Sequence, residues 1–474
     1  MPLLQKGATL IDKAGAFTYD APNRMQDIKH LTRERENLLK RLFSKNSGRP
    51  TNFRKRLAEP SGKKRRLRKV LPLIALVLAL WPLYSLLAPA IPPIPSVRKA
   101  DAGSAAQKLP KLSPLDRFQS LQLSTDLLSA AKGVGTRIES PLPDGGSVLY
   151  NLDMELQDKV ARFFAEKHVP YGVFVALEPK TGRVLGMVSH SSVDPDWHKQ
   201  AYYQIYPMAS LFKIITASAA LEHNRVSPDT VIAFNGRLTS VNPHYWQPRG
   251  RRSPEMSLTD AMGKSVNPVF GRLASEFVGR DDLVLQANRF GFNQNLFPGT
   301  AIMQSTAFSP QSDAELKLMG AGLGREVKVS PLHAASMMAA VANRGVMMTP
   351  LLAEKVTSGS GEVLFSATPL ELRRLLTEET SAKLAKTLST TVNKGTSRRA
   401  FHDRRGRALL SRLNIAAKTG SIDGKTPEGQ YSWFAAYAPM EDPQIALVAL
   451  VVNQGRWNVK ASHVGEKALE AFFR

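Results

Sequence analysis

Residues 206–217 read Tyr206-Pro-Met-Ala-Ser-Leu-Phe-Lys-Ile-Ile-Thr-Ala217 and place a hydroxyl group and an amine three residues apart at the start of an apolar segment. Side chains with this spacing share one face of a helix, so the amine of Lys213 reaches the hydroxyl of Ser210. Pro207 suits a first helical turn, where an N–H has no partner in any case. Ser210 would then lie near the positive end of the helix dipole, which favours an alkoxide-like nucleophile.

The Ser-x-x-Lys pattern is weak evidence by itself, because residues 211–221 also fit an ordinary buried helix. The pattern occurs at three other places, Ser61–Lys64, Ser96–Lys99 and Ser129–Lys132. Two later triplets carry more weight. Ser265-Val-Asn267 lies between two expected helices, and Lys418-Thr419-Gly420, followed by Ser421, lies in an expected strand. The sequence therefore predicts that three separated triplets form one site.

The Lys-Thr-Gly and Ser-x-Asn triplets each occur a second time in the chain. Lys180-Thr-Gly182 precedes Ser210 and fits a polar turn between two strands. Ser240-Val-Asn242 lies in a loop rich in Asn, Pro and Gly, without flanking helices. We therefore favour Ser265 and Lys418 as the members of the site.

A lysine-paired serine, then Ser-x-Asn, then Lys-Thr-Gly resembles the signature of the penicillin-binding transpeptidase family. The resemblance covers roughly residues 146–474. It extends to six further segments: 151–157, 176–186, 320–324, 329–334, 395–396 and 433–439.

The expected fold class is α/β (α+β), similar to the β-lactamase and transpeptidase architecture. Five stretches read as strands: 171–177, 184–190, 413–422, 432–439 and 444–452. Together they predict a five-stranded, mostly antiparallel sheet flanked by helices. The helical region 206–345 is inserted between the early and the late strands, and the resemblance implies a cleft between it and the sheet edge.

An alcohol needs a base within hydrogen-bond reach, and Lys213 serves only when its amine is neutral. Burial and a second cation both lower the pKa of a lysine, and Lys418 is the expected second cation. Ser265 could relay the proton to the leaving amine, while Asn267 holds Lys213 and the substrate backbone.

The third triplet suits a free carboxylate, the terminus of a D-Ala-D-Ala stem peptide. Lys418, Thr419 and Ser421 offer positive charge and hydroxyls, and Gly420 lets the strand backbone approach the substrate. The resemblance implies that the backbone N–H groups of Ser210 and Ser421 form the oxyanion hole.

The resemblance implies a peptidoglycan D,D-transpeptidase. Ser210 would form an acyl-enzyme on the D-Ala-D-Ala donor, an amine acceptor from a second stem peptide would resolve it, and β-lactams would acylate the same serine. A soluble β-lactam hydrolase needs a group that activates water, and residues 291–305 contain no acidic residue. A D,D-carboxypeptidase, a membrane-anchored β-lactam sensor and a non-catalytic wall-synthesis scaffold remain open.

The composition bounds the remaining possibilities. The chain has 474 residues, no cysteine and a formal charge of +24. Its nine histidines show no metal-ligand spacing, so we expect no metal and no cofactor. The basic tail, residues 1–69, would bind anionic membrane lipid. Nucleic acid is the rival partner for such a tail, but nothing there resembles a nucleic-acid-reading module.

Residues 70–91 form an apolar run of 22 residues without a charge, long enough to cross a bilayer. Basic residues crowd its N-terminal side, so we expect a single-pass anchor in the bacterial cytoplasmic membrane, with residues 1–69 in the cytoplasm and the catalytic part outside. A cleaved signal peptide is the alternative. Residues 92–145 are expected as a stalk, too short for a glycan-polymerising domain, and residues 146–474 as the transpeptidase domain. A separate glycan polymerase is therefore an expected partner.

Overall fold

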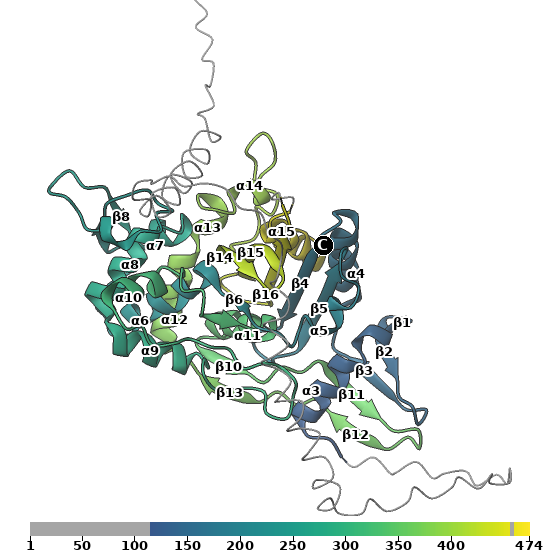
Figure 1. Cartoon of the computed structure of the whole chain (residues 1–474). Coiled ribbons are helices and arrows are strands. Elements are labelled where there is room, and N and C mark those ends of the chain that lie inside the picture. Colours follow the sequence, from purple (N-terminus) through teal and green to yellow (C-terminus); the bar gives the residue numbers. More distant parts are fainter. Residues whose placement is uncertain (1–113, 456–458) are drawn as a thin grey trace, which may run out of the picture. The chain divides into compact units, whose positions relative to one another are not determined.

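The computed structural model describes residues 114–455 and 459–474, and a sheet of five strands lies at its centre (Figure 1). The strand order is β14-β15-β16-β4-β5, and every neighbouring pair is antiparallel. The bounds are β4 Tyr171–Leu177, β5 Val184–Ser191, β14 Ala416–Lys425, β15 Glu428–Ala438 and β16 Ile445–Asn453. The predicted pairing of two early strands with three late ones is confirmed, and β14 is an edge strand.

Helices cover both faces of this sheet. The covering helices are α4 Met154–Glu166, α15 Ala461–Phe472 and α11 Pro331–Ala342. Phe174 and Leu447 belong to the apolar cluster that includes α4 and α15, whereas the adjacent Val175 and Val448 belong to the cluster that includes α11. Because successive strand residues point to opposite faces, a strand covered on both sides must be apolar throughout. Every residue of β16 is buried.

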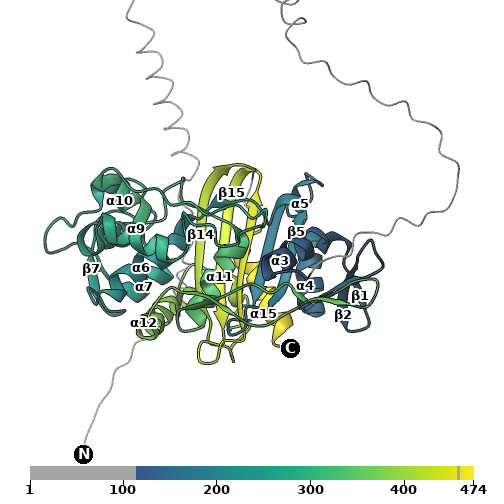
Figure 2. The ribbon, with the colours of Figure 1, turned by 90° about the horizontal axis from the view of Figure 1, so that it is seen from below.

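The helical part gathers beside the β14 edge of the sheet (Figure 2). Its members are α6 Lys213–Glu222, α7 Leu258–Gly263, α8 Asn267–Arg272, a π-helical turn Leu273–Val278, α9 Arg280–Arg289, α10 Asp313–Gly320 and α12 Glu378–Leu388. A 3₁₀ turn, Ala209–Phe212, precedes α6 and contacts β14. The start of α6 and the sheet edge therefore face each other.

A second antiparallel sheet has the order β1-β2-β3-β11-β12. Its strands are β1 Lys132–Val134, β2 Arg137–Pro141, β3 Ser147–Tyr150, β11 Ala353–Thr357 and β12 Val363–Ser366, and helix α3, Arg117–Asp126, lies beside β11. The hydroxyl of Tyr150 donates to the carbonyl of Ser124 at 2.9 Å, which ties α3 to β3. Residues 114–145 are thus part of the folded domain. The expected stalk, residues 92–145, therefore extends too far, because α3, β1 and β2 lie within it. Strand β3 pairs with β11, which lies some 200 residues away along the chain, so no local sequence pattern shows this pairing.

The remaining elements are short. They are α5 Trp197–Gln200, β6 Tyr206–Pro207, β7 Val231–Ala233, β8 Glu255–Ser257, β9 Lys328–Val329, β10 Val346–Met348, β13 Glu371–Arg374, α13 Thr390–Asn393, α14 Arg398–Phe401 and the 3₁₀ turns Leu128–Ala130 and Pro243–Tyr245.

The expected membrane segment, residues 70–91, lies outside the described residues, as do the tail 1–69 and residues 92–113. Among the helices of residues 114–455 and 459–474, none combines the length and the apolar character that crossing a bilayer requires.

Candidate active site

Ser210 and Lys213 lie on one side of the turn that opens α6. Ser210 belongs to the 3₁₀ turn Ala209–Phe212, and Lys213 is the first residue of α6. Residues three apart eclipse each other in a 3₁₀ turn, so Lys213 Nζ lies 2.8 Å from Ser210 Oγ. Pro207 does not begin the helix as predicted. It lies in the two-residue strand β6, where its position pairs with Lys328 of β9, a contact between distant segments that local sequence does not show.

The Ser-x-Asn triplet brings two more groups to the same amine. Lys213 Nζ donates to Asn267 Oδ1 at 2.7 Å and lies 3.2 Å from both the hydroxyl and the carbonyl oxygen of Ser265. Ser265 sits between α7 and α8 with φ +56°, an uncommon conformation for a residue other than glycine. That conformation follows the end of α7 and turns Ser265 toward the amine.

Lys418 joins the site from the sheet side. Its Nζ donates to Ser265 Oγ at 2.8 Å and to the carbonyl of Thr419 at 2.7 Å. A continuous hydrogen-bonded chain therefore runs from Ser210 through Lys213 and Ser265 to Lys418. The three triplets converge, as the sequence predicted.

Both amines are withdrawn from solvent, since Lys213 and Lys418 have no exposed surface and Ser210 retains 8%. Burial, with the nearby charge of Lys418 as the second cause, holds the pKa of Lys213 well below its ordinary value. Burial also lowers the pKa of Lys418 to about 7. Neither amine takes part in an ion pair among the described residues. A neutral amine at Lys213 can accept the proton of Ser210.

Strand β14 forms the other wall of the site. Ser421 is exposed, Thr419 is half-buried, and a Cβ on Gly420 would lie 3.1 Å from Cβ of Ala209. Gly420 thus keeps the strand close to the serine turn. Because β14 is an edge strand, its outer backbone groups are available to an extended peptide.

Sequence reasoning did not assign Thr396 to the site. Its hydroxyl lies 2.6 Å from that of Thr419, and its N–H donates to the carbonyl of Gly263 at 3.0 Å. Thr396 therefore links the end of α7 to β14. The only sequence signal was the family-like pair Gly395-Thr396, and nothing in it indicated which residue Thr396 would face.

Three residues that the sequence did not mark as functional fix the backbone next to Ser210. Ala209 has φ +53° and Gly322 has φ +68°. A Cβ on Gly322 would lie 2.4 Å from the Ala209 carbonyl oxygen and 2.7 Å from Ser210 Cα. Trp433 Nε1 donates to the Pro207 carbonyl at 2.8 Å and fixes the approach to the turn.

A cavity of about 920 Å³ adjoins the site without containing Ser210. Its lining residues include Tyr171, Trp197 and Pro207, together with Asp423 and Lys425 at the far end of β14. The edge of β14 therefore leads from Ser421 into this cavity.

Neither of the two repeated triplets supplies a reacting group. Lys180 is exposed in the β4–β5 turn and pairs with Asp442 at 2.8 Å. Ser240 supports the site instead of replacing Ser265, because its carbonyl accepts from Asn267 Nδ2 at 3.1 Å and its hydroxyl from Trp246 Nε1 at 3.1 Å. Within the part of the chain that the structure describes, no group of three or more acidic or histidine side chains is placed to hold a metal ion.

Comparison with known proteins gives the family. The model of the penicillin-binding protein transpeptidase domain matches residues 172–474. The peptidoglycan D,D-transpeptidase PbpA of Mycolicibacterium smegmatis is 30% identical over 323 residues, 60% of this chain and 62% of that protein. The stage V sporulation protein D of Bacillus subtilis is 26% identical, over 66% of this chain and 51% of that protein. This chain thus spans between half and two thirds of the length of these two relatives.

A solved structure shares the fold. The crystal structure of PBPA from Mycobacterium tuberculosis superposes with a TM-score of 0.58 at 23% identity, covering 70% of this chain and 83% of that one. With the three triplets in one site and most of the folded part inside the match, this chain belongs to the penicillin-binding protein transpeptidase family.

Proposed function

We propose that this protein is a peptidoglycan D,D-transpeptidase that cross-links stem peptides through an acyl-enzyme on Ser210. One observation carries the proposal: a serine hydroxyl, two buried amines and a second hydroxyl form one hydrogen-bonded chain beside an edge strand. The name of the M. smegmatis relative, a peptidoglycan D,D-transpeptidase, supports it.

The donor peptide lies extended along the outer edge of β14. Its terminal carboxylate meets Lys418, the hydroxyl of Thr419 and the hydroxyl of Ser421, and Thr396 holds Thr419 from the other side. The remainder of the donor stem follows the strand toward Asp423 and the adjoining cavity. Backbone pairing with an edge strand supplies affinity, and the side chains at the cleft supply the preference for a free carboxylate.

Acylation then proceeds without any additional group. The neutral amine of Lys213 takes the proton of Ser210, and Oγ bonds to the carbonyl carbon of the penultimate D-alanine. The N–H groups of Ser210 and Ser421 stabilise the negative oxygen, and each donor lowers the activation barrier by about 3–4 kcal/mol. The proton passes through the hydroxyl of Ser265 to the leaving nitrogen, the C–N bond breaks, and D-alanine departs. Lys213 is neutral again at the end of this step.

An amine acceptor resolves the acyl-enzyme. The acceptor nitrogen occupies the place of the departed D-alanine, returns a proton along the same chain and forms the new peptide bond. Neither lysine pairs with a carboxylate among residues 114–455 and 459–474, so no carboxylate contacts the base to help activate water. A β-lactam on Ser210 would therefore persist. Hydrolysis by water, the carboxypeptidase reaction, is the second candidate.

The expected membrane anchor remains part of this proposal. A span over residues 70–91 would hold the catalytic domain on the outer side of the cytoplasmic membrane, and the basic tail 1–69 would contact anionic lipid inside the cell. A separate glycan polymerase would supply the uncross-linked strands. The apolar run and the charge asymmetry around it support this topology.

A reconstituted cross-linking assay tests the reaction. The full chain, in detergent, is incubated with glycan strands that carry uncross-linked pentapeptide stems, and the muropeptides are separated after digestion. We expect cross-linked dimers and free D-alanine in equal amounts, both lost in Ser210→Ala. Release of D-alanine without dimers would identify a carboxypeptidase. If neither product forms and Ser210→Ala behaves like the natural chain, the result would contradict an enzymatic role. The non-catalytic wall-synthesis scaffold would then be the remaining alternative.

A further inference from the structure

Two arginine-rich loops are hydrogen-bonded to residues of the site. The first arginine loop, residues 234–254, carries Arg237, Arg249, Arg251 and Arg252. The second arginine loop, residues 394–414, carries Lys394, Arg398, Arg399, Arg404, Arg405, Arg407 and Arg412. All eleven side chains belong to exposed residues, and Asp403 is the one acidic residue in either loop.

These loops hold the whole positive excess of the folded part. Residues 114–474 have a formal charge of +8, whereas the first arginine loop has +4 and the second has +6. Everything else in this range sums to −2. Of the arginines in these loops, only Arg407 forms an ion pair among the described residues, with Asp403 at 2.8 Å. Such a concentration of uncompensated like charge repels itself and attracts an anionic partner.

Each loop is bonded to a member of the catalytic site. In the first loop, the carbonyl of Leu238 accepts from the N–H of Asn267 at 2.8 Å. In the second, the hydroxyl of Thr396 lies 2.6 Å from that of Thr419. The loops therefore rise from the two walls of the cleft, one from the Ser-x-Asn side and one from the β14 side.

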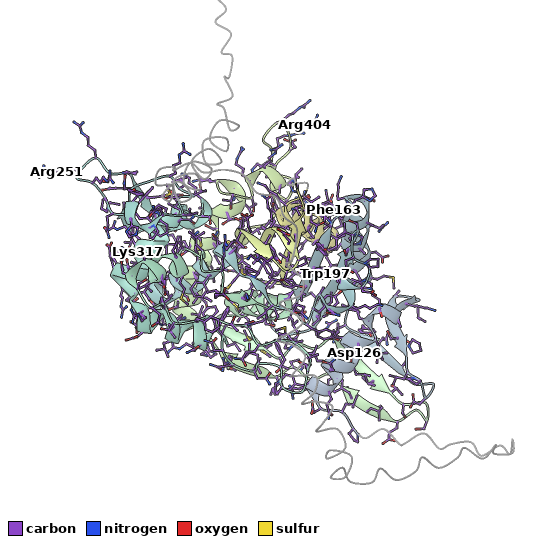
Figure 3. All side chains as sticks on the ribbon, in the orientation of Figure 1. Asp126, Phe163, Trp197, Arg251, Lys317 and Arg404 are labelled. Atoms are coloured by element: carbon purple, nitrogen blue, oxygen red, sulfur yellow. The ribbon has the colours of Figure 1, made fainter. Side chains whose placement is uncertain are left out.

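Figure 3 places the loop tips on a common side of the domain, with Arg251 on one and Arg404 on the other. Asp126, at the end of α3, lies at the opposite end of the domain in the same view. The described chain begins next to α3, so the side that the loops occupy is remote from the point where the chain enters the domain.

We propose that the two arginine loops form an anion-binding rim that holds the carboxylate-bearing strand of the wall polymer while one of its stem peptides occupies the cleft. This inference rests on the proposed function and adds the recognition of a polymeric, acidic substrate to it. Guanidinium groups bind carboxylates through paired hydrogen bonds, and the stem peptides of one strand present free carboxylates at repeated intervals. Each loop is hydrogen-bonded to a residue of the site, so a strand held by the loops lies next to the cleft.

The first loop also offers an apolar surface. Tyr245 is 54% exposed, and the guanidinium of Arg249 lies over its ring at 5.9 Å from the centroid. An exposed aromatic face beside arginines suits a sugar ring that carries an acidic peptide. An anionic lipid surface is the less favoured partner, because each loop is hydrogen-bonded to a residue of the cleft that takes the stem peptide.

The test uses three forms of the full chain in detergent. The rim variant combines Arg251→Gln, Arg252→Gln, Arg404→Gln and Arg405→Gln, four exposed side chains that form no hydrogen bond or ion pair within the described structure. The control variant removes the same charge elsewhere through Lys132→Gln, Arg137→Gln, Arg280→Gln and Lys355→Gln, which are also exposed. The basic tail is identical in all three, so only differences between them count.

Co-sedimentation with purified wall sacculi at about 50 and 200 mM salt measures binding, and the rate of labelling by a fluorescent penicillin measures the cleft alone. We expect the rim variant to bind sacculi about tenfold more weakly than the control, because four exposed ion pairs add to a loss of this size. Its binding should respond less to salt, since fewer screened contacts remain. Penicillin labelling should be equal in all three forms.

Two results would contradict the proposal that the arginine loops bind the wall polymer. One is equal sacculus binding by rim and control variants at both salt concentrations. The other is a loss of binding by the rim variant to vesicles with anionic headgroups but not to sacculi, which would assign the loops to a lipid surface. Failure of the proposed function is visible separately, as the absence of penicillin labelling in the natural chain.

Discussion

Lys418 donates a hydrogen bond to the hydroxyl of Ser265 at 2.8 Å, although 153 residues separate them along the chain. This contact closes the gap between the sheet and the helical part and completes the path from Ser210 to the second amine. Because both amines share Ser265 and both are buried, a second positive charge there is unfavourable. The arrangement holds the pKa of Lys213 well below its ordinary value, as its proposed role as a base requires.

Lys213→Met should remove the base while leaving the fold intact. Methionine has a similar length and no charge to bury, so the free energy of unfolding should stay the same or rise. Acylation by a fluorescent penicillin should slow by about 10²–10⁴-fold, the usual contribution of a positioned base. A variant that folds and labels at the natural rate would show that another group activates Ser210.

The acylation rate should rise with pH along a limb that lies well below the ordinary lysine value of 10.5, because Lys213 must lose its proton first. Removing the neighbouring cation through Lys418→Met should move this limb to higher pH, since the charge of Lys418 contributes to the low pKa of Lys213. Stopped-flow labelling from pH 5 to pH 10 gives both profiles. A limb in the variant at the same or lower pH would contradict the coupling.

The unfolding free energy should also depend on pH, because burial lowers the pKa of Lys418. The pKa of Lys418 is about 7 in the folded protein, below the unfolded value, so between these values the unfolded chain binds the extra proton. The unfolding free energy must therefore rise from about pH 7 toward pH 10.5, and fall as the pH drops through that window. Denaturant titrations should show a smaller rise in Lys418→Met than in the natural chain. Parallel curves for the two proteins would mean that Lys418 is charged when folded.

Thr396→Val should weaken the β14 wall without disturbing the proton path. The substitution removes the hydroxyl 2.6 Å from Thr419, and a lost hydrogen bond of about 1 kcal/mol corresponds to a roughly fivefold slower acylation. Thr396→Ser keeps the hydroxyl and should restore most of the rate. If valine and serine behave alike, the hydroxyl pair has no part in orienting Thr419.

Gly322→Ala should displace the serine turn. Its Cβ would meet the Ala209 carbonyl oxygen at 2.4 Å, so both stability and acylation should fall. Gly299→Ala is the matched control, because Gly299 also has a positive φ, +77°, but has open space around it. The control should lose only about 1–2 kcal/mol, the conformational penalty, and should label at the natural rate. Equal losses in the two variants would show that Gly322 matters for its conformation alone.

The site could be predicted from the sequence because each triplet carries its own local signal. Ser210 and Lys213 lie within one turn, and the flanking helices of Ser265 and the strand of Lys418 have clear periodicities. The sheet followed from the same patterns, since strands buried on both faces read as continuous apolar runs. The resemblance to a known family supplied the order in which these pieces meet.

What could not be predicted depends on contacts between distant segments. Pro207 lies in a strand because β9 pairs with it, and residues 132–150 form strands because β11 completes their sheet. Thr396 looked like one polar residue among many until the fold placed it against Thr419. The arginine loops were visible as charge, but only the structure showed that both border the same cleft.

The proposed reaction depends on one oxygen atom, the hydroxyl of residue 210. Tandem mass spectrometry of the full chain after incubation with penicillin would locate the adduct directly. We predict a single acyl group on the peptide that contains Ser210, absent in Ser210→Ala and formed slowly in Lys213→Met. No adduct on the natural chain, or an adduct on another residue, would contradict it.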